Sequence, residues 1–427
     1  MKLAKIDSEV LNSALLGLTF MFLYSAFYTL SNLEKLILHS VRRDDPEYGG
    51  DGFVSLSILY ISFALFMWVV PPLMSVTGQK YSLCLGAIGF SLFLASFLPE
   101  QAWLLYLGSA CNGIGAAIIW TCQGVYVILN STAATVTRNT AIFSGLCHSS
   151  MLYGNLFVYF CFEGKTSIDR PTRLLVVWVL LGLTVAAVFI ALLLPPPVYA
   201  PERSIPKYGA LQAIRKSWAV ATTKHMLILC PMFFYCGLQI SYLSGIFGAA
   251  VGFTTYADGF SSNQLVAATG FFTGIGEVLA EIFLVLMNPF LVRRPWMRSA
   301  VVFLGMISDF VAFLLSYLMY SNNSIFGPTN ETTIITSRSW LAILIALLLG
   351  FSDGIFMPML ISVVGKIYPS ATASALTIYT FCFSLASAVS FFYSAYLGLH
   401  TQLSVLVGQG ITGAVAFAYV NHCISNE

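Results

Sequence analysis

Four carboxylates lie inside long apolar stretches of this 427-residue chain, and a charge at bilayer depth is costly enough to make each a functional candidate. Glu277 and Glu281 stand four residues apart and therefore on one face of a helix. Asp309 and Asp353 lie in the next two stretches, and no lysine or arginine lies at similar depth. Such carboxylates bind protons in coupled steps, as a proton-coupled carrier requires. The alternative is that each is permanently protonated and bonds to a neighbouring helix.

Other polar side chains in apolar stretches are weaker candidates. His148 could titrate, or it could be a satisfied polar contact. Gln123 could orient a ligand, or it could make a hydrogen bond between helices. Glu34 and Lys35 end the first stretch, and we expect both side chains to reach the water interface.

Enzymatic chemistry finds no support in the sequence. Residues 350–354 match the pattern Gly-x-Ser-x-Gly, but that motif requires a strand-to-helix turn, whereas here it falls within an apolar helix. The nine cysteines lie in apolar stretches without the spacing of metal ligands. We therefore expect no catalytic residues, no metal and no cofactor.

The composition places the chain in lipid. Apolar residues make up 58% and charged residues only 9% of the sequence, and the mean hydropathy is +0.83, whereas soluble domains carry about 25% charge. A net charge of +2 offers no electrostatic surface for nucleic acid. We predict an integral membrane protein whose main partner is the lipid bilayer, and we exclude a soluble enzyme and a nucleic-acid binder.

Apolar runs of about 20 residues, the length that crosses a bilayer as a helix, recur along the whole chain. Because backbone amides in lipid must be satisfied within their own segment, we predict an all-α, multi-pass fold. Twelve transmembrane helices are expected, at residues 11–33, 53–74, 82–97, 103–129, 139–162, 174–194, 226–253, 265–290, 297–320, 340–364, 373–397 and 403–420.

The basic residues predict the orientation of these helices. With the amino terminus in the cytoplasm, thirteen lysines and arginines fall on the cytoplasmic side and seven on the other. The glycosylation sequons at Asn322 and Asn330 then face the exterior or a lumen, and a third at Asn130 faces the cytoplasm and should stay unmodified. We predict that both termini are cytoplasmic, without deciding between the plasma and endolysosomal membranes.

The longest polar interruption divides the chain into two halves. We predict a first six-helix half at 1–194, a cytoplasmic linker at 195–224 and a second half at 225–427. Trp218 beside Arg215 and Lys216 fits a helix at the membrane surface, although a plain linker fits equally. Short similar segments at corresponding positions favour a duplicated unit with pseudo-two-fold symmetry, whose ligand site lies between the halves.

Polar and glycine-containing motifs run from the fourth stretch to the end of the chain. They are Trp120-Thr121-Cys122-Gln123-Gly124, Asn130-Ser131, Arg138-Asn139, Ile142-Phe143, Ser149-Ser150, Gly154-Asn155-Leu156, Gly164-Lys165-Thr166, Ser244-Gly245, Gly274-Ile275-Gly276-Glu277, Asp353 and Phe391-Phe392-Tyr393-Ser394. Together they resemble the uncoordinated-ninety-three family, an ion-channel-regulatory branch of the major facilitator superfamily, and most closely its branch named domain-containing protein eleven. The resemblance covers nearly the whole chain.

This resemblance implies a major facilitator fold and two alternative functions. One is an accessory protein that regulates or traffics a potassium channel or a receptor; the other is a proton-coupled carrier of a small solute. The superfamily's gating motif between the second and third helices survives here only as Gly78-Gln79-Lys80, which favours the accessory role. In the tenth helix, Met357-Pro358-Met359 replaces a Thr-Gln pair of the relatives, so any polar contact of that pair is missing.

Overall fold

The computed structural model describes residues 2–132, 135–165, 167–199, 210–294, 296–329, 331–369 and 371–426. This described part is helical and contains no strand, which confirms the all-α prediction. The helices are α1 (Lys2–Asp44), α2 (Gly52–Phe66), α3 (Val70–Ala95), α4 (Ala102–Leu129), α5 (Val136–His148), α6 (Ser150–Cys161), α7 (Arg170–Leu193), α8 (Ala210–Ala221), α9 (Lys224–Ser241), the π-helical η1 (Tyr242–Ile246), α10 (Phe247–Phe253), α11 (Ser262–Arg293), α12 (Met297–Met319), α13 (Ser339–Ile367), α14 (Thr372–Ser394) and α15 (Leu399–Asn426).

Nine segments of the described chain are long and apolar enough to cross a membrane. They are α1, α4, α7, the run from α9 to α10, and each helix from α11 to α15. The other three expected spans are interrupted or short: α2 has 15 residues, α3 turns at Gly78, where φ is +74°, and Ser149 separates α5 from α6. The multi-pass architecture is thus shown, and the count of twelve stays a prediction.

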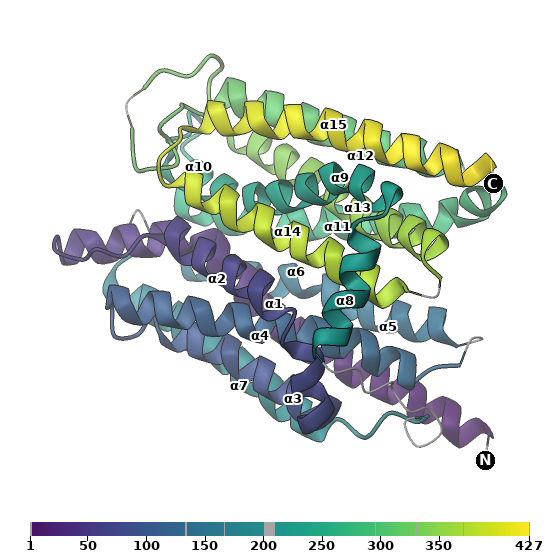
Figure 1. Ribbon diagram of the computed structural model, residues 1–427. Helices are drawn as coiled ribbons and strands as arrows, with labels where there is room; N and C mark the ends of the chain where they lie inside the picture. Colours follow the sequence, from purple (N-terminus) through teal and green to yellow (C-terminus); the bar gives the residue numbers. More distant parts are fainter. Residues whose placement is uncertain are drawn as a thin grey trace.

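Two helical bundles make up the molecule (Figure 1). The first contains α1 to α7 and the second contains α9 to α15, and α8 lies between them against α14. Both termini lie at the same end of the bundles, at the right of Figure 1. We call this end the terminal face, and we call the other end, where α1 finishes at Asp44 and α15 begins at Leu399, the opposite face.

The two bundles meet mainly through α1, α2 and α6 of the first bundle. Helix α2 packs on α14, α6 packs on α11, and α1 packs on η1, α10 and α11. Glycines let α10 approach α1 closely, because a Cβ at Gly248 would lie 2.5 Å from the Asn32 carbonyl oxygen and one at Gly252 would lie 2.4 Å from Leu36 Cδ2. Near the opposite face the rings of His39 and Phe253 also touch, with centroids 5.1 Å apart. The bundles are therefore in close contact at this end.

The π-helical turn η1 lies in the middle of the segment that packs on α1. All five of its residues are buried. With its amide nitrogen turned toward η1, Asn32 donates to the carbonyl oxygens of Leu243 (3.3 Å) and Ser244 (3.1 Å). A π turn replaces the regular backbone ladder and is frequent at functional sites. It therefore gives Asn32 of α1 a polar contact with the second bundle.

Candidate functional site

Four titratable side chains lie where the bundles touch, and we call them the interhalf cluster: His148, Glu277, Glu281 and Asp353. His148 ends α5 of the first bundle, whereas Glu277 and Glu281 lie on α11 and Asp353 lies on α13 of the second. Nδ1 of His148 forms an ion pair with Oε1 of Glu281 and so links the two bundles directly. The cluster unites four of the six membrane residues that the sequence singled out.

Acidic groups outnumber basic groups in the interhalf cluster. Glu277 is 7% exposed and lies within electrostatic range of Asp353 and Glu281, while His148 is within range of Asp353. Glu277 and Asp353 make no hydrogen bond to any other residue in the described ranges. Three carboxyl groups therefore share one imidazole, so the charge of the cluster depends on how many protons it holds. This arrangement can bind and release protons.

Glycines set the position of Glu277 by bringing α11 close to both neighbours. A Cβ at Gly350 of α13 would lie 2.0 Å from the Thr273 carbonyl oxygen, and one at Gly354 would lie 3.0 Å from the Glu277 carbonyl oxygen. Toward α6, a Cβ at Gly274 would lie 2.9 Å from Met151 Cβ. These contacts hold the α11 backbone between a helix of its own bundle and a helix of the other.

Asp309 belongs to a different environment from the interhalf cluster. Its carboxyl group accepts hydrogen bonds from the hydroxyls of Tyr235 on α9 and Ser352 on α13, and all three residues are fully buried within the second bundle. Gln239 extends the network, because its amide donates to Ser352 Oγ at 3.5 Å. Asp309 thus ties three helices of one bundle together, which fits the structural alternative.

The remaining candidates lie apart from the cluster. Gln123 of α4 is half-buried, and within the described chain its side chain has no hydrogen-bond partner. Asn322 is half-buried at the opposite face, where its Oδ1 accepts a hydrogen bond of 3.0 Å from the His400 backbone. Asn330 lies outside the described residues. Asn130 is fully buried at the terminal face and donates to the Glu9 carbonyl oxygen at 2.8 Å.

Glu34 corrects one expectation from the sequence. Its side chain does not reach an interface, because Glu34 is 1% exposed and neither carboxyl oxygen has a hydrogen-bond partner among the residues described. The hydroxyl of Ser55 is paired with that of Ser109, at 2.8 Å. Lys35 is mostly buried as well, and it pairs with Asp51 and lies 4.5 Å from the centre of the Phe53 ring.

The sequence did not predict two polar networks of the structure, because the members of each network are far apart in the chain. At the terminal face, buried Glu9 pairs with Arg138 at 3.1 Å and accepts a hydrogen bond of 2.7 Å from Tyr199, so it fixes the start of the linker. At the opposite face, Arg173 is 2% exposed and pairs with Asp44 and, at 2.9 Å, with Glu100. The one feature of the sequence that could have indicated a role for Glu9 is its position as an acidic residue just before an apolar span.

The described chain contains no group of three or more side chains placed to hold a metal ion. The four side chains of the interhalf cluster can exchange protons and form hydrogen bonds.

Comparisons with known proteins agree on both family and fold. The family model described as "Ion channel regulatory protein UNC-93" matches residues 48–418. UNC93-like protein MFSD11 of Xenopus laevis is 31% identical over 432 residues, with 96% of each chain covered. Among solved structures, nucleoside transporter NupG superposes with a TM-score of 0.64 at 16% identity, covering 96% of this chain and 98% of its own. Peptide transporter POT, in complex with sulfate, gives 0.66 at 13% identity, covering 97% and 94%.

Proposed function

The chain belongs to the UNC-93 family of multi-pass membrane proteins with a major facilitator fold, and on this basis we propose that it is a non-enzymatic, proton-coupled carrier of a small solute. The observation that supports this most directly is the ion pair between His148 and Glu281, which joins the two bundles beside two carboxyl groups that form no hydrogen bond with other described residues. A titratable link between halves is what couples proton binding to their relative movement.

The proposed coupling follows from the charges of the interhalf cluster. The contact between His148 and Glu281 is an ion pair only while His148 carries a proton, so loss of that proton removes the attraction and weakens the contact between α5 and α11. Glu277, one helical turn away, and Asp353 then exchange protons with the same site. Protonation of His148 therefore favours the closed contact, and its deprotonation favours separation of the bundles near the cluster.

In this proposal the terminal face is cytoplasmic. The basic surplus of that face supports the orientation, because lysine and arginine are retained on the cytoplasmic side. Glu9, the acidic side chain described there, is buried and paired with Arg138. The buried state of Asn130 agrees with a sequon that carries no glycan.

The proton site can be tested without knowing the solute. Proteoliposomes containing the full chain are adsorbed to a solid-supported membrane, and the displaced charge is recorded after a jump from pH 8 to pH 6. We expect a transient in the wild type, and a loss of at least about tenfold in Glu277→Gln and in Asp353→Asn, because each removes a proton acceptor. Asp45→Asn, an exposed carboxylate outside the spans, is the matched control.

Solute uptake into the proteoliposomes is then measured with a nucleoside and a dipeptide as probes. These probes are chosen because the two structural relatives are described as a nucleoside transporter and a peptide transporter. Coupled uptake that depends on a proton gradient and is lost in the same variants supports the carrier. A wild-type protein that gives no charge displacement contradicts it.

A second candidate, an accessory protein for a channel or receptor, is supported by the description of the family as ion channel regulatory. The reduced gating motif at Gly78-Gln79-Lys80, where the chain turns with φ +74° inside α3, also favours it. Purification in mild detergent followed by native mass spectrometry separates the two candidates. A channel or receptor bound in one-to-one ratio, and retained by Glu277→Gln and Asp353→Asn, supports the accessory role, whereas a solitary chain favours the carrier.

A further inference from the structure

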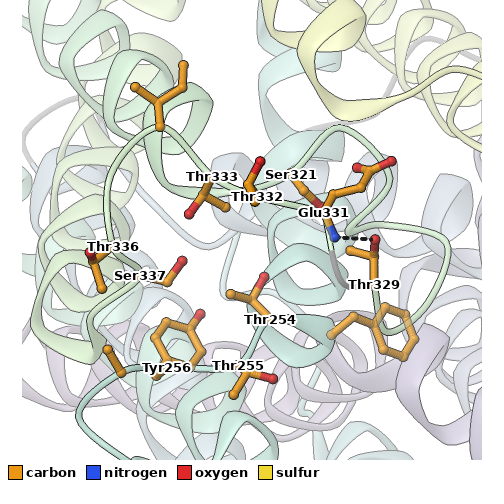
Figure 2. A pocket seen from close by; sticks show the side chains of 13 residues that line it. Thr254, Thr255, Tyr256, Ser321, Thr329, Glu331, Thr332, Thr333, Thr336 and Ser337 are labelled. Atoms are coloured by element: carbon orange, nitrogen blue, oxygen red, sulfur yellow. Dashed lines mark hydrogen bonds between the residues drawn. The ribbon is translucent and has the colours of Figure 1, made fainter.

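A cavity lies at the opposite face, away from the interhalf cluster. It has a volume of about 640 Å³ and is lined entirely by the second bundle, by the turn after α10 and the segment between α12 and α13. Ligand sites of small molecules commonly measure about 300–1,000 Å³. Figure 2 shows side chains from both segments pointing into this space, and hydroxyl groups predominate among them.

Several of these hydroxyls are free to bind a ligand. Ser321 is 5% exposed, and its Oγ has no hydrogen-bond partner in the part of the chain that is described. Thr255, Thr332 and Thr336 are exposed at the cavity, and their side chains bond to no other described residue. A hydroxyl both donates and accepts, so the four together offer donors and acceptors on opposite walls. A buried hydroxyl without a protein partner is unusual in a folded protein, and the Oγ of Ser321 can bond to a molecule in the cavity.

The walls of the cavity are held by their own hydrogen bonds. The backbone of Ala257 donates to Ser337 at 3.0 Å, and the Ser339 backbone and hydroxyl donate to Asp258 at 2.9 and 2.6 Å. The bonds from Ser339 hold the pKa of the Asp258 carboxyl below its usual range, so the charged acceptor persists at neutral pH. The two segments are thus fixed relative to each other across the cavity.

The lining excludes most classes of ligand. None of the lining residues is basic, which disfavours an anion. The one carboxylate, Glu331, already accepts hydrogen bonds from the side chain and backbone of Asn323, and the described chain has no metal-binding cluster. Hydroxyls are poor partners for an apolar molecule, whereas they match the donors and acceptors of a sugar's own hydroxyl groups.

We propose that this cavity binds a neutral saccharide. The chemistry is the same whether the sugar is free, belongs to the glycan of another molecule, or is a glycan carried by this chain at the sequon Asn330-Glu331-Thr332, two residues of which line the cavity. The site is separate from the interhalf cluster, so this proposal can be tested independently of the carrier proposal.

The test uses the full chain in lipid nanodiscs, because maltoside detergents would themselves compete. Maltose and diacetylchitobiose are the probes, and binding is read by saturation-transfer nuclear magnetic resonance. We expect a signal for the wild type and a loss of at least about tenfold in affinity for the double variant Thr255→Val/Thr336→Val, since each lost hydrogen bond weakens binding several-fold. Thr401→Val, exposed at the same face but outside the cavity, should bind like the wild type.

Two further samples identify the source of the sugar and separate this site from the carrier. Enzymatic removal of N-glycans, or the variant Asn330→Gln, should increase binding of the probes if the chain's own glycan occupies the cavity and leave it unchanged if the ligand comes from elsewhere. Glu277→Gln should bind the probes normally. The proposal is overturned if neither sugar binds in any sample, or if the double variant, with a normal melting temperature, binds like the wild type.

Discussion

At the scale of single residues, buried carboxyl groups in this protein differ by the partners they have. Asp309 and Glu277 are both acidic, buried and surrounded by apolar helices. Asp309 receives hydrogen bonds from two hydroxyls, whereas Glu277 has other carboxyl groups as its electrostatic neighbours and no hydrogen bond among the described residues. The first arrangement stabilises a fixed structure, and the second leaves a group that can change its protonation.

Asp309 should therefore matter for stability. In Asp309→Leu the hydroxyl of Tyr235 loses its acceptor inside the bundle, which should lower the free energy of unfolding by about 1–3 kcal/mol. Asp309→Asn keeps an acceptor oxygen and should cost less than about 1 kcal/mol. Denaturation by sodium dodecyl sulfate in mixed micelles measures both. Equal losses for the two variants would show that the hydrogen bond to Tyr235 is unimportant.

Sequence spacing predicted only part of the site. The i, i+4 relation of Glu277 and Glu281 placed them on one helical face, and that relation is local. The pairing of Glu281 with His148 joins residues 133 positions apart across two bundles, and no local pattern encodes such a contact. For the same reason the donors to Asp309 were not foreseen, because Tyr235 and Ser352 come from two other helices.

At the scale of helices, glycines decide which pairs come into backbone contact. Helices α11 and α13 approach until a Cβ at Gly350 would overlap the Thr273 carbonyl oxygen, and α10 approaches α1 in the same way. In lipid, close packing of backbones replaces the hydrophobic effect as the main attraction between helices. Apolar run lengths predicted most helices, but they could not reveal the break at Ser149 or the π turn, because neither changes the hydropathy.

The contact between α11 and α13 gives a direct prediction. Gly350→Ala places a methyl group 2.0 Å from a backbone oxygen, so the helices must move apart and unfolding should become easier by about 1–3 kcal/mol. The same variant should reduce the proton-dependent charge displacement, because Glu277 moves with α11. Gly182→Ala is the matched control: it lies on the exposed side of α7 with nothing within 4 Å, and it should be neutral or stabilising. A wild-type melting temperature for Gly350→Ala would refute the packing argument.

At the scale of the whole molecule, the two bundles share one interface. The contacts between α1 and α10 close this interface at the opposite face. Composition alone was sufficient to predict an all-helical membrane protein, since the lipid environment permits few alternatives. Which face of each helix meets the other bundle was not predictable, because apolar side chains cover lipid-facing and buried surfaces alike.

A carrier must open this interface, and the opening can be measured as a distance between the two bundles. Spin labels at Glu163 of the first bundle and Thr401 of the second, in a background without native cysteines, report the distance across the opposite face. We expect two distance populations whose ratio changes between pH 8 and pH 5, and a ratio insensitive to pH in Glu277→Gln. Labels at Glu163 and Trp103, both in the first bundle, should give one constant distance. A single distance at every pH would argue for a static accessory protein.

The π turn η1 has a consequence for how relatives should align with this chain. A π turn contains one residue more than the α-helical turn it replaces, so it corresponds to a single-residue insertion. Removing one residue from Tyr242–Ile246 would restore a continuous α-helix and rotate α10 by about 100° about its axis. Gly248 and Gly252 of α10 would then no longer face α1, and bulkier side chains would face Asn32 and Leu36 instead. The contact between the two halves at this end thus depends on the length of one helix as much as on its residues, and a gap in an alignment at this position would mark a protein whose halves meet differently.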